Sequence, residues 1–248
     1  MPTLPALKTA ACVLAFDTST ELLAVGLQTL QGAFTAQAAG GASASTGLLP
    51  QINRLLARAG VAYADLDAIA FGRGPGAFTG LRTACAVAQG IGLATGKLLL
   101  PIDSLQLVAE DARAQTGASD VVVLMDARMD EVYGGRFAWQ GGRWTVLQPS
   151  ALFTLPALPV LWALWQGAGP DVFAGSALAA VPALAGRLGL PADSPRCESE
   201  RDRASALLRL AMQAAARDEG VDAAAALPLY LRDKVALTTR EREAARAA

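Results

Sequence analysis

Short apolar runs, each ended by small or polar residues, mark the first part of the chain. Residues 13–16, 22–27 and 33–38 predict three β-strands, because the Ser, Thr, Gln and Gly between the runs are typical of turns. Five apolar residues then recur at the spacing of an α-helix: Leu48, Leu49, Ile52, Leu55 and Leu56. Gly60 follows, where a glycine commonly ends a helix. The pattern predicts a β-meander followed by an amphipathic helix.

A glycine-rich segment, residues 72–82, follows the predicted strand 66–71. Six of its residues define a structural turn: Gly74, Pro75, Gly76, Phe78, Thr79 and Arg82. The two glycines permit positive φ, the proline stiffens the bend, and Thr79 is expected to cap a helix that runs to Thr95 and ends at Gly96. A strand over 97–102 and a helix that Ser104 is expected to cap and that runs to about residue 115 complete this half of the chain.

The second half repeats the order of the first. Strand 121–125 ends at Asp126, as strand 13–16 ends at Asp17. A hairpin over 131–147, a strand over 171–174 and a helix over 201–217 follow. The repeat predicts two similar α/β lobes with mixed sheets flanked by helices, a layout that resembles the actin-like ATPase (ASKHA, ribonuclease H-like) fold. We expect the lobes over residues 1–105 and 106–232, with a charged, frayed tail over 233–248.

Composition excludes several kinds of chemistry. The chain has no histidine, so neither a Ser-His-Asp nor a Cys-His arrangement can form. Its three cysteines are scattered and indicate no disulfide framework. The apolar stretch 151–165 is short and interrupted by prolines, which does not suit a bilayer span. We therefore expect a cytoplasmic protein without histidine-based catalysis or a histidine metal site. Composition alone leaves open a carboxylate-only Mg²⁺ site completed by substrate phosphates, but we assign no catalytic residue and no metal ligand.

Phosphate binding is the chemistry that the glycine-rich segment suggests, because a helix N-terminus attracts anions. The segment has no lysine and does not match a Walker A loop. In the actin-like fold, phosphates lie against the turns that follow the first strand of each lobe. Asp17, Thr18 and Ser19 could form the first such turn, whereas residues 126–131 are bulky and contain three acids that would repel a triphosphate. We expect a vestigial nucleotide loop rather than a working site.

A stripe of minimal side chains marks the helix behind the turn, since Gly80, Ala84, Ala88 and Gly92 are spaced four apart. Such a stripe allows another element to approach closely. Two interpretations follow from the stripe alone. The helix packs on the chain's own sheet, or it forms a helix–helix seam with a partner, together with the helix over 48–59.

Several segments occur in an order that resembles the TsaB (YeaZ) family of bacterial tRNA-modification proteins. The most specific is Gly-Pro-Gly-Ala-Phe-Thr-Gly-Leu-Arg at 74–82. Supporting segments lie at 15–19, 88–90, 104–105, 126–128, 131–133 and 230–233, so the resemblance covers nearly the whole chain.

The resemblance implies a non-catalytic paralogue of TsaD, the subunit that transfers a threonylcarbamoyl group to tRNA adenosine. It implies pairing with a TsaD-type paralogue through helices of the first lobe, a TsaE-type ATPase that joins them, and tRNA reached only through the complex. No cofactor is expected, except ATP or ADP at the interface with partner subunits. A homodimer could replace the pair in the absence of a partner. The implied interface comprises Leu48, Leu49, Ile52, Leu55, Leu56, Gly80, Leu81, Ala84, Cys85 and Ala88.

Two alternatives remain open at this point. Fold analogy alone favours a small-molecule kinase or ATPase of the actin-like class. A direct RNA-binding module is the second alternative, which the net charge of −1 and the few lysines disfavour.

Overall fold

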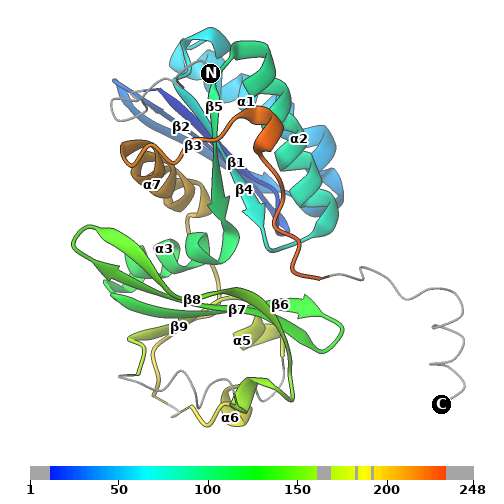
Figure 1. Cartoon of the computed structure of the whole chain (residues 1–248), viewed down its shortest axis with the longest axis vertical. Coiled ribbons are helices and arrows are strands. Elements are labelled where there is room, and N and C mark those ends of the chain that lie inside the picture. Colours follow the sequence, from blue (N-terminus) through cyan, green and yellow to red (C-terminus); the bar gives the residue numbers. More distant parts are fainter. Residues whose placement is uncertain (1–11, 161–168, 182–183, 191–192, 233–248) are drawn as a thin grey trace, which may run out of the picture.

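The computed structural model describes residues 12–160, 169–181, 184–190 and 193–232, and within them the chain forms two five-stranded sheets (Figure 1). The first sheet contains β1 (Val13–Asp17), β2 (Leu22–Thr29), β3 (Gly32–Ala39), β4 (Ala68–Gly74) and β5 (Leu98–Asp103), in the order β3-β2-β1-β4-β5. Strands β1, β2 and β3 pair antiparallel, whereas β4 pairs parallel with both β1 and β5. The sheet is therefore mixed, as predicted.

The second sheet repeats this arrangement strand for strand. It contains β6 (Asp120–Arg128), β7 (Glu131–Gln140), β8 (Arg143–Thr154), β9 (Val172–Ala174) and β10 (Arg196–Cys197), in the order β10-β9-β6-β7-β8. Its first three strands pair antiparallel, and β9 pairs parallel with both β6 and β10. Strand β6 thus occupies the place that β1 holds in the first sheet. The predicted duplication of lobes is confirmed.

Helices cover both faces of the first sheet. Across the described residues the helices are α1 (Ala44–Ala59), α2 (Phe78–Thr95), α3 (Ser104–Thr116), α5 (Ala177–Ala180), α6 (Leu184–Arg187) and α7 (Arg203–Ala216), with 3-10 turns η1 (Gly41–Ser43), η2 (Tyr63–Asp65) and η3 (Ala223–Ala225). Helices α1 and α2 lie on one face and α7 on the other (Figure 1). The run in β1 is apolar throughout because both faces are buried, with Leu14 and Phe16 toward α1 and α2, and Val13 and Ala15 toward α7.

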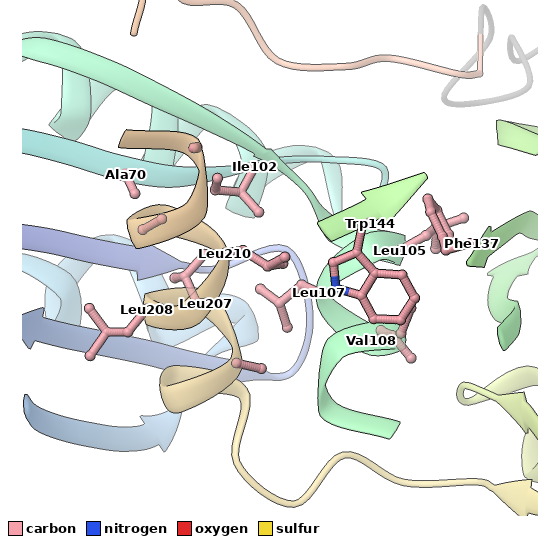
Figure 2. Packing of buried hydrophobic residues seen from close by; sticks show 14 of the residues in the cluster. Ala70, Ile102, Leu105, Leu107, Val108, Phe137, Trp144, Leu207, Leu208 and Leu210 are labelled. Carbon is pink, nitrogen blue, oxygen red and sulfur yellow. The ribbon is translucent and has the colours of Figure 1, made fainter. Parts of the chain in front are cut away.

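One apolar cluster joins the two lobes. It includes Leu207 and Leu210 of α7, Leu105 and Val108 of α3, and Phe137 of β7, all buried (Figure 2). Because α3 packs on α7 and on strands of both sheets, this cluster is common to the two lobes, and each lobe has a further buried cluster of its own.

The C-terminal part of the chain returns to the first lobe. Helix α7 packs on β1 and β2, and the amide of Val221 donates a hydrogen bond to the carbonyl of Leu99 at 2.8 Å. The predicted division at residue 105 separates the two sheets, but residues 203–229, which the prediction gave to the second lobe, pack largely on the first. The predicted tail over 233–248 lies outside the described residues.

Two helix starts differ from the prediction. Helix α2 begins at Phe78 with Ala77 as its N-cap, so Thr79 lies inside the helix and does not cap it. Helix α3 is capped by Asp103, whose Oδ1 accepts hydrogen bonds from the amides of Leu105 and Gln106 at 2.8 and 3.2 Å. The predicted ends of α1 at Gly60 and of α2 at Gly96 are confirmed.

Candidate functional site

A cleft of about 520 Å³ lies between the two lobes. The β1–β2 turn and the start of α2 line it on one side, and the β6–β7 turn lines it on the other. Residues 229–232 form a further wall. Because β1 and β6 hold equivalent places in their sheets, the cleft brings together the two turns that the sequence analysis singled out.

The carboxylate of Asp17 is fully buried behind Ser19, Ser104 and Arg203, which line this cleft, and it is paired with Arg203. Nε of Arg203, also fully buried, donates to Oδ1 of Asp17 at 2.9 Å. The amide and hydroxyl of Ser19 donate to the same oxygen at 3.0 and 2.9 Å, and the Ser104 hydroxyl lies 3.4 Å from Oδ2. The first turn therefore satisfies its own acid without a ligand.

Arg203 is held from a second side by Glu200, which accepts a hydrogen bond from Nη1. Burial disfavours the charged guanidinium, but Asp17 and Glu200 outweigh it and raise the pKa of Arg203 above its usual value. Burial raises the pKa of Glu200, although Arg203 acts in the opposite direction. The site is a buried cation between two acids, contributed by β1 and by the start of α7.

The glycines of the predicted turn make room for the β1–β2 turn. A Cβ on Gly72 would lie 1.6 Å from Oδ2 of Asp17, and one on Gly80 would lie 1.8 Å from the carbonyl oxygen of Thr18. Gly74 has a φ of +112°, as predicted. Gly76 is not among the residues with positive φ, and it is needed because a Cβ would lie 2.5 Å from the Ser19 carbonyl oxygen. These glycines serve close packing of the chain on itself.

The turn between β6 and β7 is occupied by the protein's own arginines. Arg128 donates its amide to Oδ1 of Asp126 at 2.8 Å and places Nη1 3.1 Å from Oδ2. Nη2 of Arg232 donates to the carbonyls of Ala127 and Arg128 at 2.8 and 3.3 Å. Three consecutive residues, Arg128, Met129 and Asp130, have φ between 56° and 61°, a region that costs energy for non-glycine residues. The turn is bulky, as expected from its sequence.

Nine of the ten residues assigned to a partner interface are buried within the chain itself. They are Leu48, Ile52, Leu55, Leu56, Gly80, Leu81, Ala84, Cys85 and Ala88. The sequence analysis placed these nine residues at a partner surface, but in this structure they are buried against β-strands of the first sheet and neighbouring segments. Of the ten, Leu49 is exposed, at 45%. The predicted stripe of small residues therefore packs on the chain's own sheet, which is the first of its two interpretations.

A second stripe of small residues on α2 faces outward. Thr79, Ala86 and Gly90 are exposed, a Cβ on Gly90 would meet nothing within 4 Å, and Leu93 is 69% exposed. This stripe follows the same helical spacing as the buried one. Sequence reasoning missed it because small residues recur on both faces of α2, so spacing alone does not show which face meets the sheet.

Two motifs that lie 148 residues apart in the sequence meet beside the cleft. The ring centroids of Phe78 and Tyr230 lie 5.3 Å apart, and the guanidinium of Arg82 lies 3.9 Å from the centroid of Phe78. Nε of Arg82 donates to the hydroxyl of Tyr230 at 3.2 Å. Phe78 and Arg82, predicted as turn residues, thus fix the C-terminal segment of the described chain. None of the described helices is long and apolar enough to cross a membrane.

Comparison with known proteins places this geometry in a family. The family model of TsaD, tRNA N6-adenosine threonylcarbamoyltransferase, matches residues 41–156. The TsaB protein of Escherichia coli is 32% identical over 190 residues, which cover 76% of this chain and 80% of that protein. The TsaB protein of Haemophilus influenzae is 38% identical over 121 residues, and this match spans 49% of the chain and about half (51%) of the relative. Both are described as tRNA threonylcarbamoyladenosine biosynthesis proteins.

Solved structures agree with these relatives. A Pseudomonas aeruginosa protein described as similar to peptidase YeaZ has a TM-score of 0.80 and 38% identity, covering 90% of this chain and all of that one. YeaZ from the same organism has a TM-score of 0.77 and 37% identity, covering 89% of this chain and all of that one.

Two lobes with one repeated strand order, meeting at a cleft between the turns after β1 and β6, define a protein of the actin-like ATPase fold. Within that fold, the extent and identity of the E. coli match identify the family. The chain belongs to the TsaB (YeaZ) family.

Proposed function

We propose that the chain is a non-catalytic subunit in the biosynthesis of threonylcarbamoyladenosine in tRNA. In this proposal it pairs with a TsaD-type transferase, a TsaE-type ATPase joins the pair, and tRNA is reached through the complex. Membership of the TsaB family supports the pathway. The single observation that carries the non-catalytic role is the buried pair of Asp17 and Arg203.

That pair argues against catalysis at the fold's usual position. A phosphate-binding turn needs free amides, yet the Ser19 amide is bonded to Asp17. The Thr18 carbonyl is held against α2, and the amide of Ala77 is bonded to the Ser19 carbonyl at 2.8 Å. The chain has no histidine to act as a general base or a metal ligand. At this turn the Ser19 amide and the Asp17 carboxylate are therefore already bonded within the chain.

The outward face of α1 and α2 is the surface we propose for the TsaD-type partner. Ala86 and Gly90 permit a close approach of another helix, and Leu49 and Leu93 supply exposed apolar area. The two helices contain Arg54, Arg58 and Arg82 and no acidic residue, so an acidic surface on the partner would complement them. This face replaces the buried residues that the sequence analysis assigned.

Co-purification with the TsaD-type paralogue of the same organism tests the proposal. We expect Ala86→Arg to abolish the complex, because the side chain would stand on the outward face of α2. Ala179→Arg, an equivalent change at an exposed alanine of α5 in the other lobe, is the matched control and should retain it. Retention of the complex by both variants would show that this face is not the interface. Ala84→Arg is unsuitable, since Ala84 is fully buried and the variant would unfold.

A small-molecule kinase or ATPase is the second candidate, and the cleft of about 520 Å³ is the observation that favours it. Calorimetry of the isolated chain with ATP and Mg²⁺ separates the two candidates. We expect no tight binding by the isolated chain, with any nucleotide bound only in the presence of partner subunits. Tight binding with turnover would favour the kinase.

A further inference from the structure

Residues 226–232 run along α2 and then cross toward the second lobe (Figure 1). The carbonyl of Ala226 accepts hydrogen bonds from Nε2 of Gln89 at 2.9 Å and from Sγ of Cys85 at 3.5 Å. Three residues later, the amide of Leu229 donates to the carbonyl of Arg73 at 2.7 Å. The segment has no helix or strand of its own beyond this point, so side-chain contacts hold it.

The first of these contacts is at the N-terminal end of α2. Tyr230 stacks at a tilt on Phe78, and Nε of Arg82 donates to its hydroxyl. Arg82 also lies over the Phe78 ring, so the three side chains form one cluster. Tyr230 is 45% exposed, so the cluster is open to solvent and to any molecule that covers the end of α2.

The second contact is two residues further on, in the other lobe. The guanidinium of Arg232 donates to the carbonyls of Ala127 and Arg128 and to the carboxylate of Glu131. These groups flank the β6–β7 turn, whose residues 128–130 all have positive φ. Arg232 therefore holds a turn whose backbone conformation is unfavourable and would relax without support.

We propose that residues 229–232 form a strap that couples the N-terminal end of α2 to the β6–β7 turn and thereby controls solvent access to the cleft between the lobes. All four residues line that cleft. Without the contact between Tyr230 and Arg82, a longer part of the strap is unanchored. The contact of Arg232 with the turn must then offset a larger loss of conformational entropy, so this contact is weakened. The proposal rests on the proposed function in one respect: the molecule that would displace Arg82 from Tyr230 is a protein partner bound on α2.

Hydrogen–deuterium exchange on the isolated full chain tests the strap without any partner. Arg232→Ala removes the contact of the strap with the β6–β7 turn, and Arg82→Ala removes its contact at the other end, where α2 begins. We expect both to speed exchange of the amides in residues 126–132 by about three- to tenfold, as for loss of one ordinary hydrogen bond. Tyr230→Phe, which removes the hydroxyl and keeps the ring, should give a smaller rise at the same amides.

Arg54→Ala is the matched control, because Arg54 is exposed on α1 and its only described hydrogen bond is to Pro50 of the same helix. It should leave exchange in residues 126–132 unchanged, and all variants should leave exchange in β1 unchanged, which excludes global unfolding as the cause. The strap is overturned if Arg232→Ala speeds exchange at the turn while Arg82→Ala and Tyr230→Phe do not, or if none of the three affects it. A failure of co-purification with a TsaD-type protein would leave these results standing, so the two proposals can fail separately.

Discussion

Asp17 and Arg203 form a fully buried ion pair, with Oδ1 and Nε 2.9 Å apart across a separation of 186 residues in sequence. The acid ends the first strand of the first lobe, and the base lies at the start of the helix that returns from the second half of the chain. In this position the guanidinium neutralises the buried carboxylate of the turn after β1. The pair also fastens α7 to β1.

Removing the charge of Asp17 should destabilise the chain strongly. Asp17→Asn leaves Arg203 buried with Glu200 as its remaining acid, which we expect to cost about 3 kcal/mol of unfolding free energy. Asp126→Asn is the matched control at the equivalent strand of the second lobe. Its acid faces an Arg128 side chain that is 77% exposed, so the cost should be below about 1 kcal/mol. Urea unfolding measures both, and equal losses would contradict the account.

Two glycines of α2 should respond in opposite directions to alanine. Gly80→Ala would place a Cβ 1.8 Å from the Thr18 carbonyl oxygen, and because backbone must move, we expect a loss of about 3 kcal/mol. Gly90→Ala meets open space and should stabilise the helix by up to about 1 kcal/mol. The difference in thermal midpoint between the variants checks this. A similar loss at both positions would mean that the helix faces the sheet differently.

Stability should fall in acid partly through Glu110, which joins three elements. Its buried carboxylate accepts hydrogen bonds from Trp144 of β8 at 2.8 Å, from Arg113 of α3, and from Arg209 of α7. Burial raises the pKa of Glu110, but these donors outweigh it and the net pKa lies below the ordinary value of 4.5. A depressed pKa contributes stability above the unfolded value, and this contribution is lost as the pH falls through the folded value.

Glu110→Gln should therefore reduce the unfolding free energy at neutral pH by about 1 to 3 kcal/mol. The difference from the wild type should shrink as the pH falls below 4.5, because the wild-type side chain is then neutral as well. Urea midpoints measured at several pH values give this difference directly. A difference that stays constant with pH would show that the charge of Glu110 does not matter.

The acid at the start of α3 should tolerate an amide. Burial raises the pKa of Asp103, although the Ser150 hydroxyl at 2.9 Å and two backbone amides oppose that rise. Asp103→Asn keeps an oxygen that caps the helix, so we expect a change of less than about 0.5 kcal/mol, whereas Asp103→Ala should cost about 1 kcal/mol. Circular dichroism during urea unfolding distinguishes them. A larger loss for asparagine than for alanine would contradict the capping role.

Local patterns were enough to predict most of the fold. The apolar run of β1 and the helix ends at Gly60 and Gly96 are set by neighbours in sequence, and each of these three features lies where it was expected. The repeat of a strand ending in Asp17 and in Asp126 was enough to indicate two lobes. These features are set by hydrogen bonding and burial over a few residues, which a sequence displays directly.

The site depends on contacts that no local pattern contains. Arg203 meets Asp17 because α7 crosses back to the first lobe, and Tyr230 meets Arg82 for the same reason. The start of α2 was misplaced because the amide of Ala77 is bonded to the carbonyl of Ser19, a contact from the β1–β2 turn. The outward stripe of Ala86 and Gly90 was overlooked because the buried stripe has the same residue types and spacing.

Nucleoside analysis of tRNA tests the central claim most directly. Cells depleted of this chain should lose threonylcarbamoyladenosine from tRNAs that read codons beginning with A. Re-expression of the wild type or of Ala179→Arg should restore the nucleoside, whereas Ala86→Arg should not. Mass spectrometry of digested tRNA measures the nucleoside in each strain. Threonylcarbamoyladenosine at wild-type levels in the depleted cells would contradict the account.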